Sequence, residues 1–152
     1  MIYLFWWLFQ DLLQVLVHGW ILAPDVFLMA LLFALPLKDH EGGLLLWVAF
    51  LGGILWDLRW SGLIGLTGGL YVMALMGMKG IWELVPPSAK GFRIVLGLVL
   101  GFHFIVGLLR LLFFGGQGEA LFVQFAGQQL GGALVALLSY LSYIGERSSF
   151  HE

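Results

Sequence analysis

The stretch 92–114, FRIVLGLVLGFHFIVGLLRLLFF, decides the fold class of this chain. It is apolar throughout except for Arg93, His103 and Arg110, and it is long enough to cross the core of a bilayer, which takes about 20 residues. The strands of a transmembrane barrel alternate polar and apolar positions, and this stretch does not. We therefore expect an all-α integral membrane protein.

The rest of the chain continues this pattern. Of its 152 residues, 61% are hydrophobic and 11% are charged, whereas about 25% are charged in a typical soluble domain. Charged residues, prolines and glycines divide the chain into six apolar segments. These segments cover 2–20, 24–37, 44–58, 62–81, 92–114 and 120–144. We expect a single domain, 1–152, in which six transmembrane helices form one bundle.

The composition also narrows the function classes. The chain has no cysteine, which excludes disulfides and thiolate metal sites, and it shows no metal-ligand spacing or nucleophile motif. A formal net charge of −2 provides no basic field for nucleic acid, and no run of Lys and Arg forms a polybasic lipid tether. The segments between the apolar runs are too short for a catalytic domain in water. We expect no enzyme activity, no cofactor and no metal.

Lys and Arg are distributed unevenly between the two ends of the expected bundle. Five of them share one end: Lys38, Lys79, Lys90, Arg93 and Arg147. The other end has Arg59, with Arg110 about one turn inside a helix end. Because basic loops stay in the cytoplasm, this pattern predicts two cytoplasmic termini. The first segment lacks the basic start of a cleaved signal peptide, so we expect it to be retained as a membrane span.

Polar side chains at membrane depth cost about 2.5–3.5 kcal/mol for each ionisable group, so each needs a partner. Asp11, which has a glutamine on either side, lies near the middle of the first segment, and His103 lies near the middle of the fifth. Their similar depth predicts a direct or water-mediated pair, either a packing contact, which we favour, or a proton relay. Gln124 and Gln128 share one helix face and add donors and acceptors for packing.

The expected topology gathers a second polar cluster at the outer surface. Its members are ionisable side chains near helix ends: His18, Asp25, Asp57, Arg59, Arg110 and Glu119. We expect the carboxylates and guanidinium groups to satisfy one another, notably by pairing of Asp57 with Arg59 or Arg110. A hydrolase with two catalytic carboxylates is the alternative, although it needs a defined carboxylate separation beside a water-filled cleft.

Two further sets of residues are candidates for contact between helices. Glycines recur four positions apart, which suits close packing or docking of a partner helix. The pairs are Gly65 and Gly69, Gly97 and Gly101, and Gly127 and Gly131. Most Trp and Tyr residues lie near segment ends, as in an interfacial belt. Trp6 and Trp7 lie one to two turns into the first segment, which makes them a candidate contact patch for another helix.

Several short motifs follow one another between Ala23 and Gly77. They are a Pro-Asp pair opening the second helix (Pro24, Asp25), Gly-x-x-x-Asp-Leu ending the third (Gly53, Asp57, Leu58), a Ser-Gly turn (Ser61, Gly62), and a glycine eight positions after the aspartate (Gly65). In this order and spacing the segment resembles the MreD family, the small membrane subunit of the bacterial rod-shape (elongation) complex. The Ser-Gly pair lies one position later here than in that family.

The resemblance implies a six-helix bundle similar to the substrate-binding (S) components of energy-coupling-factor transporters, located in the bacterial inner membrane. It implies MreC, which has one transmembrane helix, as the partner. The wider complex contains a RodA-type glycosyltransferase, a penicillin-binding transpeptidase and the actin-like MreB. The implied role is a non-enzymatic scaffold that regulates peptidoglycan synthesis and cell shape. Asp57 and Arg59 would then orient partner residues, and the glycine pairs would admit a partner helix.

Two other functions fit the same sequence. An S-component-like carrier would bind a small solute or vitamin in an outward pocket, with Asp25, Asp57 and Arg110 as contacts. An intramembrane enzyme would use Asp11 or His103, but no nucleophile, base and oxyanion donor can be named together. The outer polar residues discriminate between scaffold and carrier. A carrier needs them to line a roomy cavity, whereas in a scaffold they pair with one another.

Overall fold

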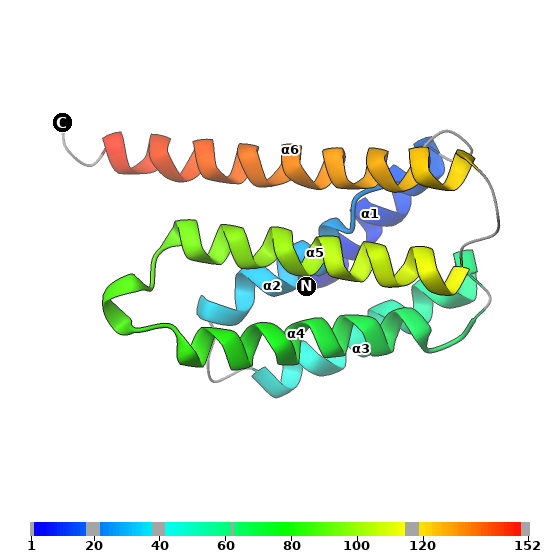
Figure 1. Cartoon of the computed structure of the whole chain (residues 1–152), viewed down its shortest axis with the longest axis horizontal. Coiled ribbons are helices and arrows are strands. Elements are labelled where there is room, and N and C mark those ends of the chain that lie inside the picture. The colour runs from blue at the N-terminus through cyan, green and yellow to red at the C-terminus, as the bar shows by residue number, and fades with distance from the viewer. Residues whose placement is uncertain (1, 18–21, 38–41, 62, 115–118, 150–152) are drawn as a thin grey trace.

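The structure is a computed structural model that describes residues 2–17, 22–37, 42–61, 63–114 and 119–149. Within these residues it is all-helical, as predicted (Figure 1). The α-helices are α1 (Ile2–Val17), α2 (Val26–Ala34), α3 (Gly42–Trp56), α4 (Leu66–Leu84), α5 (Phe92–Phe114) and α6 (Glu119–Ser149). Short 3₁₀ helices η1 (Leu35–Leu37) and η4 (Pro87–Ala89) follow α2 and α4, and the π-helix η3 (Asp57–Ser61) extends α3.

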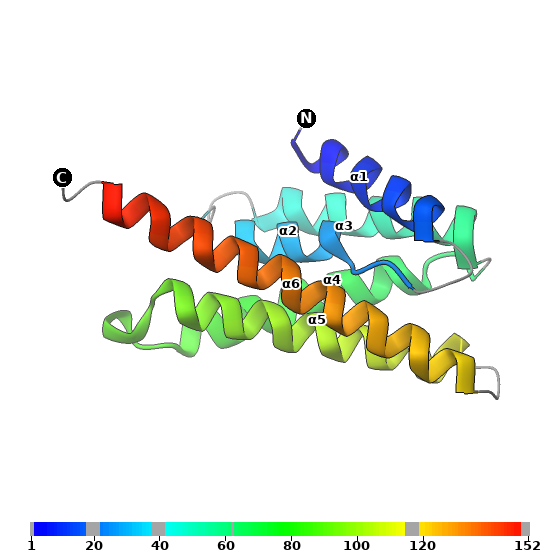
Figure 2. The same cartoon turned by 90° about the horizontal axis from the view of Figure 1, so that it is seen from above.

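The helix α2 occupies the centre of the bundle. It packs against α1, α3, α4 and α5, while α3 packs along α4 and α5 packs along α6. Figure 2 shows α2 between α1 and α6. The apolar core lies mainly between α2, α3 and α4, and its largest fully buried members include Phe27, Leu28, Leu45, Tyr71 and Met78.

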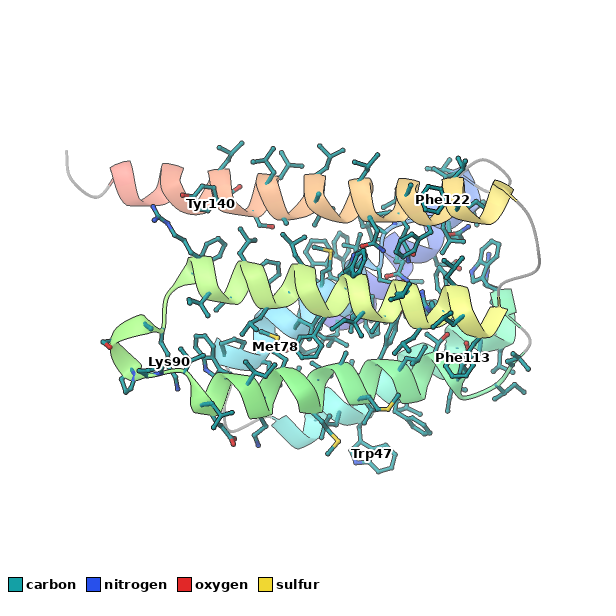
Figure 3. All side chains as sticks on the ribbon, in the orientation of Figure 1. Trp47, Met78, Lys90, Phe113, Phe122 and Tyr140 are labelled. Atoms are coloured by element: carbon teal, nitrogen blue, oxygen red, sulfur yellow. The ribbon has the colours of Figure 1, made fainter. Side chains whose placement is uncertain are left out.

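The outer surface of the bundle carries many large apolar side chains. Trp47 on α3 and Phe122 on α6 project away from the bundle (Figure 3), and their exposed fractions are 64% and 69%. Leucines on every long helix are exposed in the same way, Leu112 and Leu130 among them. Water disfavours such a surface, and lipid tails accommodate it, so the folded chain fits a membrane environment.

Three helical stretches are long and apolar enough to cross a membrane: Gly42–Trp60, Phe92–Phe113 and Phe122–Ser142. The helix α1 is a shorter apolar helix of 16 residues, and α2 has only nine residues. The second helix is therefore shorter than the predicted segment 24–37. These three stretches qualify by length and composition, and crossing of the membrane by all six segments stays a prediction.

Glycines bring two helix pairs into close contact. Gly53 on α3 lies directly against Gly68 on α4, and a methyl group at Gly53 would collide with the backbone of α4. Gly52, one residue earlier, faces the ring of Phe27 on α2. The α3–α4 contact therefore depends on the absence of a side chain at Gly53.

The glycine pairs predicted from four-residue spacing are mostly not used inside the bundle. A Cβ atom at Gly69, Gly97 or Gly101 would have no neighbour within 4 Å, so the prediction that these residues pack closely inside the bundle is wrong. Docking of a partner helix on them stays a prediction. Gly131 does pack, against the ring of Pro24. Spacing identifies glycines that share a helix face, but it does not say which face turns inward.

Candidate functional site

A buried ion pair lies at the centre of the polar residues. Asp25 is the residue before α2, and both of its carboxylate oxygens accept hydrogen bonds of 2.8 Å from Nη1 of Arg110 on α5. The side chains are 0% and 8% exposed. Nη2 of Arg110 donates to the hydroxyl of Tyr71 on α4 (2.9 Å), and this hydroxyl donates to Asp25 Oδ1 (3.1 Å). Three helices are thereby joined through one closed set of hydrogen bonds.

Two glutamines complete the surroundings of the Asp25 carboxylate. Gln10 Nε2 on α1 donates to Oδ1, and Gln128 Nε2 on α6 donates to Oδ2, each at 3.3 Å. Asp25 is therefore contacted by side chains from α1, α4, α5 and α6. Arg110 also lies over the rings of Trp56 and Tyr71, 6.0 and 5.2 Å from their centroids. A buried ion pair needs such additional partners because its two charges have lost their water. We call Asp25, Arg110, Tyr71, Gln10 and Gln128 the Asp25 network.

Gln10 also caps the start of α2. The first amide groups of a helix have no partner inside the helix, and Pro24 has no amide hydrogen at all. Gln10 Oε1 accepts from the amide of Phe27 (2.8 Å), and Gln14 Oε1 accepts from the amide of Ala23 (3.0 Å). Non-helical backbone in a membrane is tolerated only where protein groups satisfy it in this way. The side chains of α1 therefore stabilise the non-helical entry to α2.

His103 supplies the third backbone contact of this entry. Its Nε2 lies 3.2 Å from the amide nitrogen of Asp25, and its Nδ1 lies 3.2 Å from Oε1 of Gln129. Nε2 must accept from the amide, so the geometry assigns the proton to Nδ1 and makes the ring neutral. Gly132 on α6 leaves room for the imidazole.

The predicted pair of Asp11 with His103 is wrong. Oδ1 of Asp11 accepts from Nε1 of Trp60 at 2.9 Å and contacts Nε of Arg59 at 3.0 Å. Both partners belong to η3, the π-helical turn that extends α3. Equal depth in the membrane does not specify the direction in which a side chain points. Asp11 faces the end of α3, whereas His103 faces the entry to α2.

Asp57 caps α4 instead of pairing with an arginine. Its Oδ2 accepts from the amides of Gly65 and Thr67, both at 2.9 Å, and its side chain is buried. The predicted pairing with Arg59 or Arg110 is wrong, because these residues bind the carboxylates of Asp11 and Asp25. Gly65 has a φ of +93°, a left-handed conformation that glycine adopts without strain. The turn into α4 thus requires both Asp57 and Gly65.

The helix α1 is held by buried polar side chains and by Tyr3, Trp6 and Trp7, which pack against the apolar core. Its buried residues are Gln10, Asp11 and Gln14, whereas the apolar side chains on its other faces are exposed or half-buried. Trp7 adds a hydrogen bond of 2.9 Å from Nε1 to the carbonyl oxygen of Gly52 on α3. Trp7, predicted as part of a contact patch for another helix, therefore contacts α3 of the same chain. Trp6 packs edge-on against the rings of its α1 neighbours.

An apolar groove lies between α1, α2 and α6 and has a volume of about 300 Å³. Trp6, Met29, Phe33 and Val135 are among its lining residues, and none belongs to the Asp25 network.

Within the described part of the chain, no group of three or more His, Cys, Asp or Glu side chains is placed to hold a metal ion. The Asp25 network is thus suited to fixing helices relative to one another, because its acid is already bound to Arg110.

The remaining predicted residues have varied environments. Gln128 joins the Asp25 network, and Gln124 is half-buried. Gly62 and His18 lie outside the described residues, as does the side chain of Glu119.

Sequence reasoning missed Tyr71 and Gln129, and it treated the two glutamines beside Asp11 only as neighbours. Tyr71 lies in the middle of an apolar segment instead of near an end, and this signal could have identified it as a buried polar partner. Gln129 sits next to the predicted Gln128, and only the rotation of α6 shows that it reaches His103.

Comparison of the chain with protein-family models, with curated proteins and with solved structures gives no significant match. The geometry of the site and the motifs of the sequence are therefore the basis for a functional proposal.

Proposed function

We propose that this chain is a non-enzymatic scaffold of the MreD type in the bacterial inner membrane. It binds the single-span protein MreC and helps to control peptidoglycan synthesis and cell shape. One observation carries the proposal: Asp25, Asp57 and Arg110, the residues that a carrier would offer to a solute, are buried and bonded within the chain. A scaffold requires these residues to be bonded within the chain, as Asp25 is to Arg110 and Asp57 is to two amides at the start of α4.

The residues that carry the family resemblance support this proposal through their structural roles. Gly53 packs against Gly68, Asp57 caps α4, and Gly65 takes the left-handed conformation at the turn. Together they define how α3 turns into α4. Asp57 is buried, so it acts by shaping this hairpin and not by contacting a partner directly.

We further propose that all six helices cross the membrane, with both termini in the cytoplasm. The short second helix is the critical case. At about 1.5 Å per residue for α2 and about 2 Å for η1, the helical part spans about 20 Å. The non-helical residues 22–25, which turn where the amide of Val26 bonds to the carbonyl oxygen of Pro24 (2.8 Å), would cover much of the rest of a hydrocarbon core of about 30 Å. Contacts from α1 and α5 to the amides of Ala23, Asp25 and Phe27 support a non-helical crossing.

We assign the MreC contact to the outward aromatic face of α1. Phe5 and Phe9 are 60% and 40% exposed, their rings stack 6.3 Å apart, and Trp6 packs against both. The polar side chains of α1 face the bundle, so this apolar face is available to a helix in the membrane. A transmembrane helix of MreC has the matching chemistry.

Co-purification with MreC from the same genome tests the proposal. Wild-type protein and MreC are expressed together, extracted in detergent and analysed by size exclusion and mass determination, and we expect a stable complex. The variant Phe5→Ala/Phe9→Ala should lose MreC, whereas Trp47→Ala, an equally exposed aromatic on α3, should retain it. Absence of a complex with the wild type contradicts the scaffold function. Retention by the double variant contradicts only the assignment to α1.

The carrier function is the weaker candidate, because Asp25 and Arg110 would have to exchange their present partners for a solute. It predicts that an energy-coupling ATPase module or a vitamin co-purifies in place of MreC. That result would replace the scaffold proposal.

A further inference from the structure

Three cationic residues lie on the second half of α4, on the connection to α5 and on the first turn of α5. Lys79 lies in the second half of α4, Lys90 follows η4, and Arg93 lies in the first turn of α5, and all three are exposed. Nζ of Lys79 lies 4.0 Å from Glu83. Among the described residues, Lys90 and Arg93 have no carboxylate partner. Folding thus produces a positive surface that no run of basic residues in the sequence marks.

The same surface includes aromatic and aliphatic side chains. Nζ of Lys90 lies 5.1 Å from the ring centroid of Trp82, which is half-buried. This contact places the lysine beside the aromatic ring, and Figure 3 shows Lys90 at the hairpin end. Leu84 is 83% exposed and Ile81 is exposed next to it. Cations beside a Trp ring and exposed aliphatic groups are typical of the boundary between acyl chains and headgroups.

The opposite end of the bundle differs in its charge. Arg59 contacts Asp11 there, and Arg110 is buried against Asp25. Within the described residues, unpaired exposed cations are therefore found at the α4–α5 end and not at the other. In the described part of the chain, the excess positive charge lies at the α4–α5 end.

We propose that the hairpin surface formed by Trp82, Leu84, Lys90 and Arg93 binds the headgroups of anionic phospholipids. The phosphate groups complement the two unpaired cations, and Ile81 and Leu84 enter the adjoining apolar region. An acidic soluble protein would complement the charges but would leave these aliphatic side chains in water, so lipid is the occupant that fits both features.

Native mass spectrometry of the purified full chain tests this inference. The protein in detergent is titrated with phosphatidylglycerol or with phosphatidylcholine of the same acyl chains. We expect the wild type to prefer phosphatidylglycerol. Each cation near an anionic surface contributes about five-fold in affinity, so Lys90→Gln/Arg93→Gln should reduce the preference by about 25-fold. Lys90→Arg/Arg93→Lys, which keeps both charges, should retain it.

Both residues are exposed, so these variants should fold like the wild type, and circular dichroism with size exclusion checks this. Equal binding of the two lipids by the wild type contradicts the inference, as does an unchanged preference in the double glutamine variant. Displacement of the bound lipid by millimolar inorganic phosphate also contradicts it, because such a site would recognise free phosphate and not a membrane surface. The experiment does not involve MreC, so its outcome is independent of the scaffold function.

Discussion

Asp57 and Gly65 are joined across the turn between α3 and α4 by a hydrogen bond of 2.9 Å from the glycine amide to the carboxylate. The same carboxylate oxygen accepts from the amide of Thr67, the second residue of α4. A single acid thus satisfies two amides that α4 leaves unpaired.

Replacing Asp57 by alanine should destabilise the fold by about 2–3 kcal/mol, because a cap is worth about 1 kcal/mol and an orphaned buried amide costs about 1–3 kcal/mol. Asp57→Asn keeps an acceptor oxygen and should cost less. Thermal unfolding in detergent measures both. Glu83→Ala, an exposed change on the same helix, is the control and should remain within about 0.5 kcal/mol of the wild type. Equal effects of Asp57→Ala and Glu83→Ala would rule out the cap.

Alanine at Gly53 should destabilise the bundle by about 1–3 kcal/mol or more, because its methyl group meets the backbone of α4 at Gly68. The same substitution at Gly97 on α5 meets no neighbour and should be neutral or slightly stabilising, since alanine favours a helix. The two variants, compared by denaturant unfolding, differ in position but not in chemistry. A larger loss at Gly97 would show that this helix face is covered in the folded protein.

Removing one member of the central ion pair should be costly. Asp25→Ala and Arg110→Ala each leave an uncompensated buried charge, and we expect losses of about 3–5 kcal/mol. The double variant should lose clearly less than the sum, because neither charge then remains. Arg59→Ala is the comparison: Arg59 is half-exposed and should contribute about 0–1 kcal/mol through its contact with Asp11. Strict additivity of the two alanine substitutions would contradict the pairing.

Gln10→Leu should weaken the docking of α1 by about 1–3 kcal/mol, because the amide of Phe27 then has no acceptor and Asp25 loses a donor. Leu12→Ala, which truncates an exposed side chain of the same helix, should have little effect. Limited proteolysis measures how firmly α1 is docked in each variant, and thermal unfolding measures the stability of each. Identical protease sensitivity of Gln10→Leu and the wild type would show that α1 is held by other contacts.

The fold class and the positions of the six helices could be predicted from the sequence, because continuous apolar runs leave the backbone no alternative to a helix in lipid. The start of α2 and the turn before α4 could not be placed as well. Both depend on side chains that arrive from other segments, such as Gln10 at Phe27 and Asp57 at Gly65.

For the candidate site, the sequence predicts many of the residues but few of the contacts between them. The sequence identifies Asp25, Arg110, His103 and Gln128 as polar members, yet the partners it predicts for Asp11 and Asp57 are wrong. Sequence position gives the depth of a residue in a helix. The rotation of each helix about its axis decides which polar groups meet, and it depends on packing of the whole bundle.

The polar docking face of α1 has a consequence for biogenesis. Gln10, Asp11 and Gln14 leave the ribosome before any of their partners, and Arg59 and Trp60 are translated some 50 positions after Asp11. Until then the first helix carries an unmatched acid that lipid disfavours. We therefore expect stable membrane insertion of α1 to be coupled to synthesis of the α3 end, where the partners of Asp11 lie.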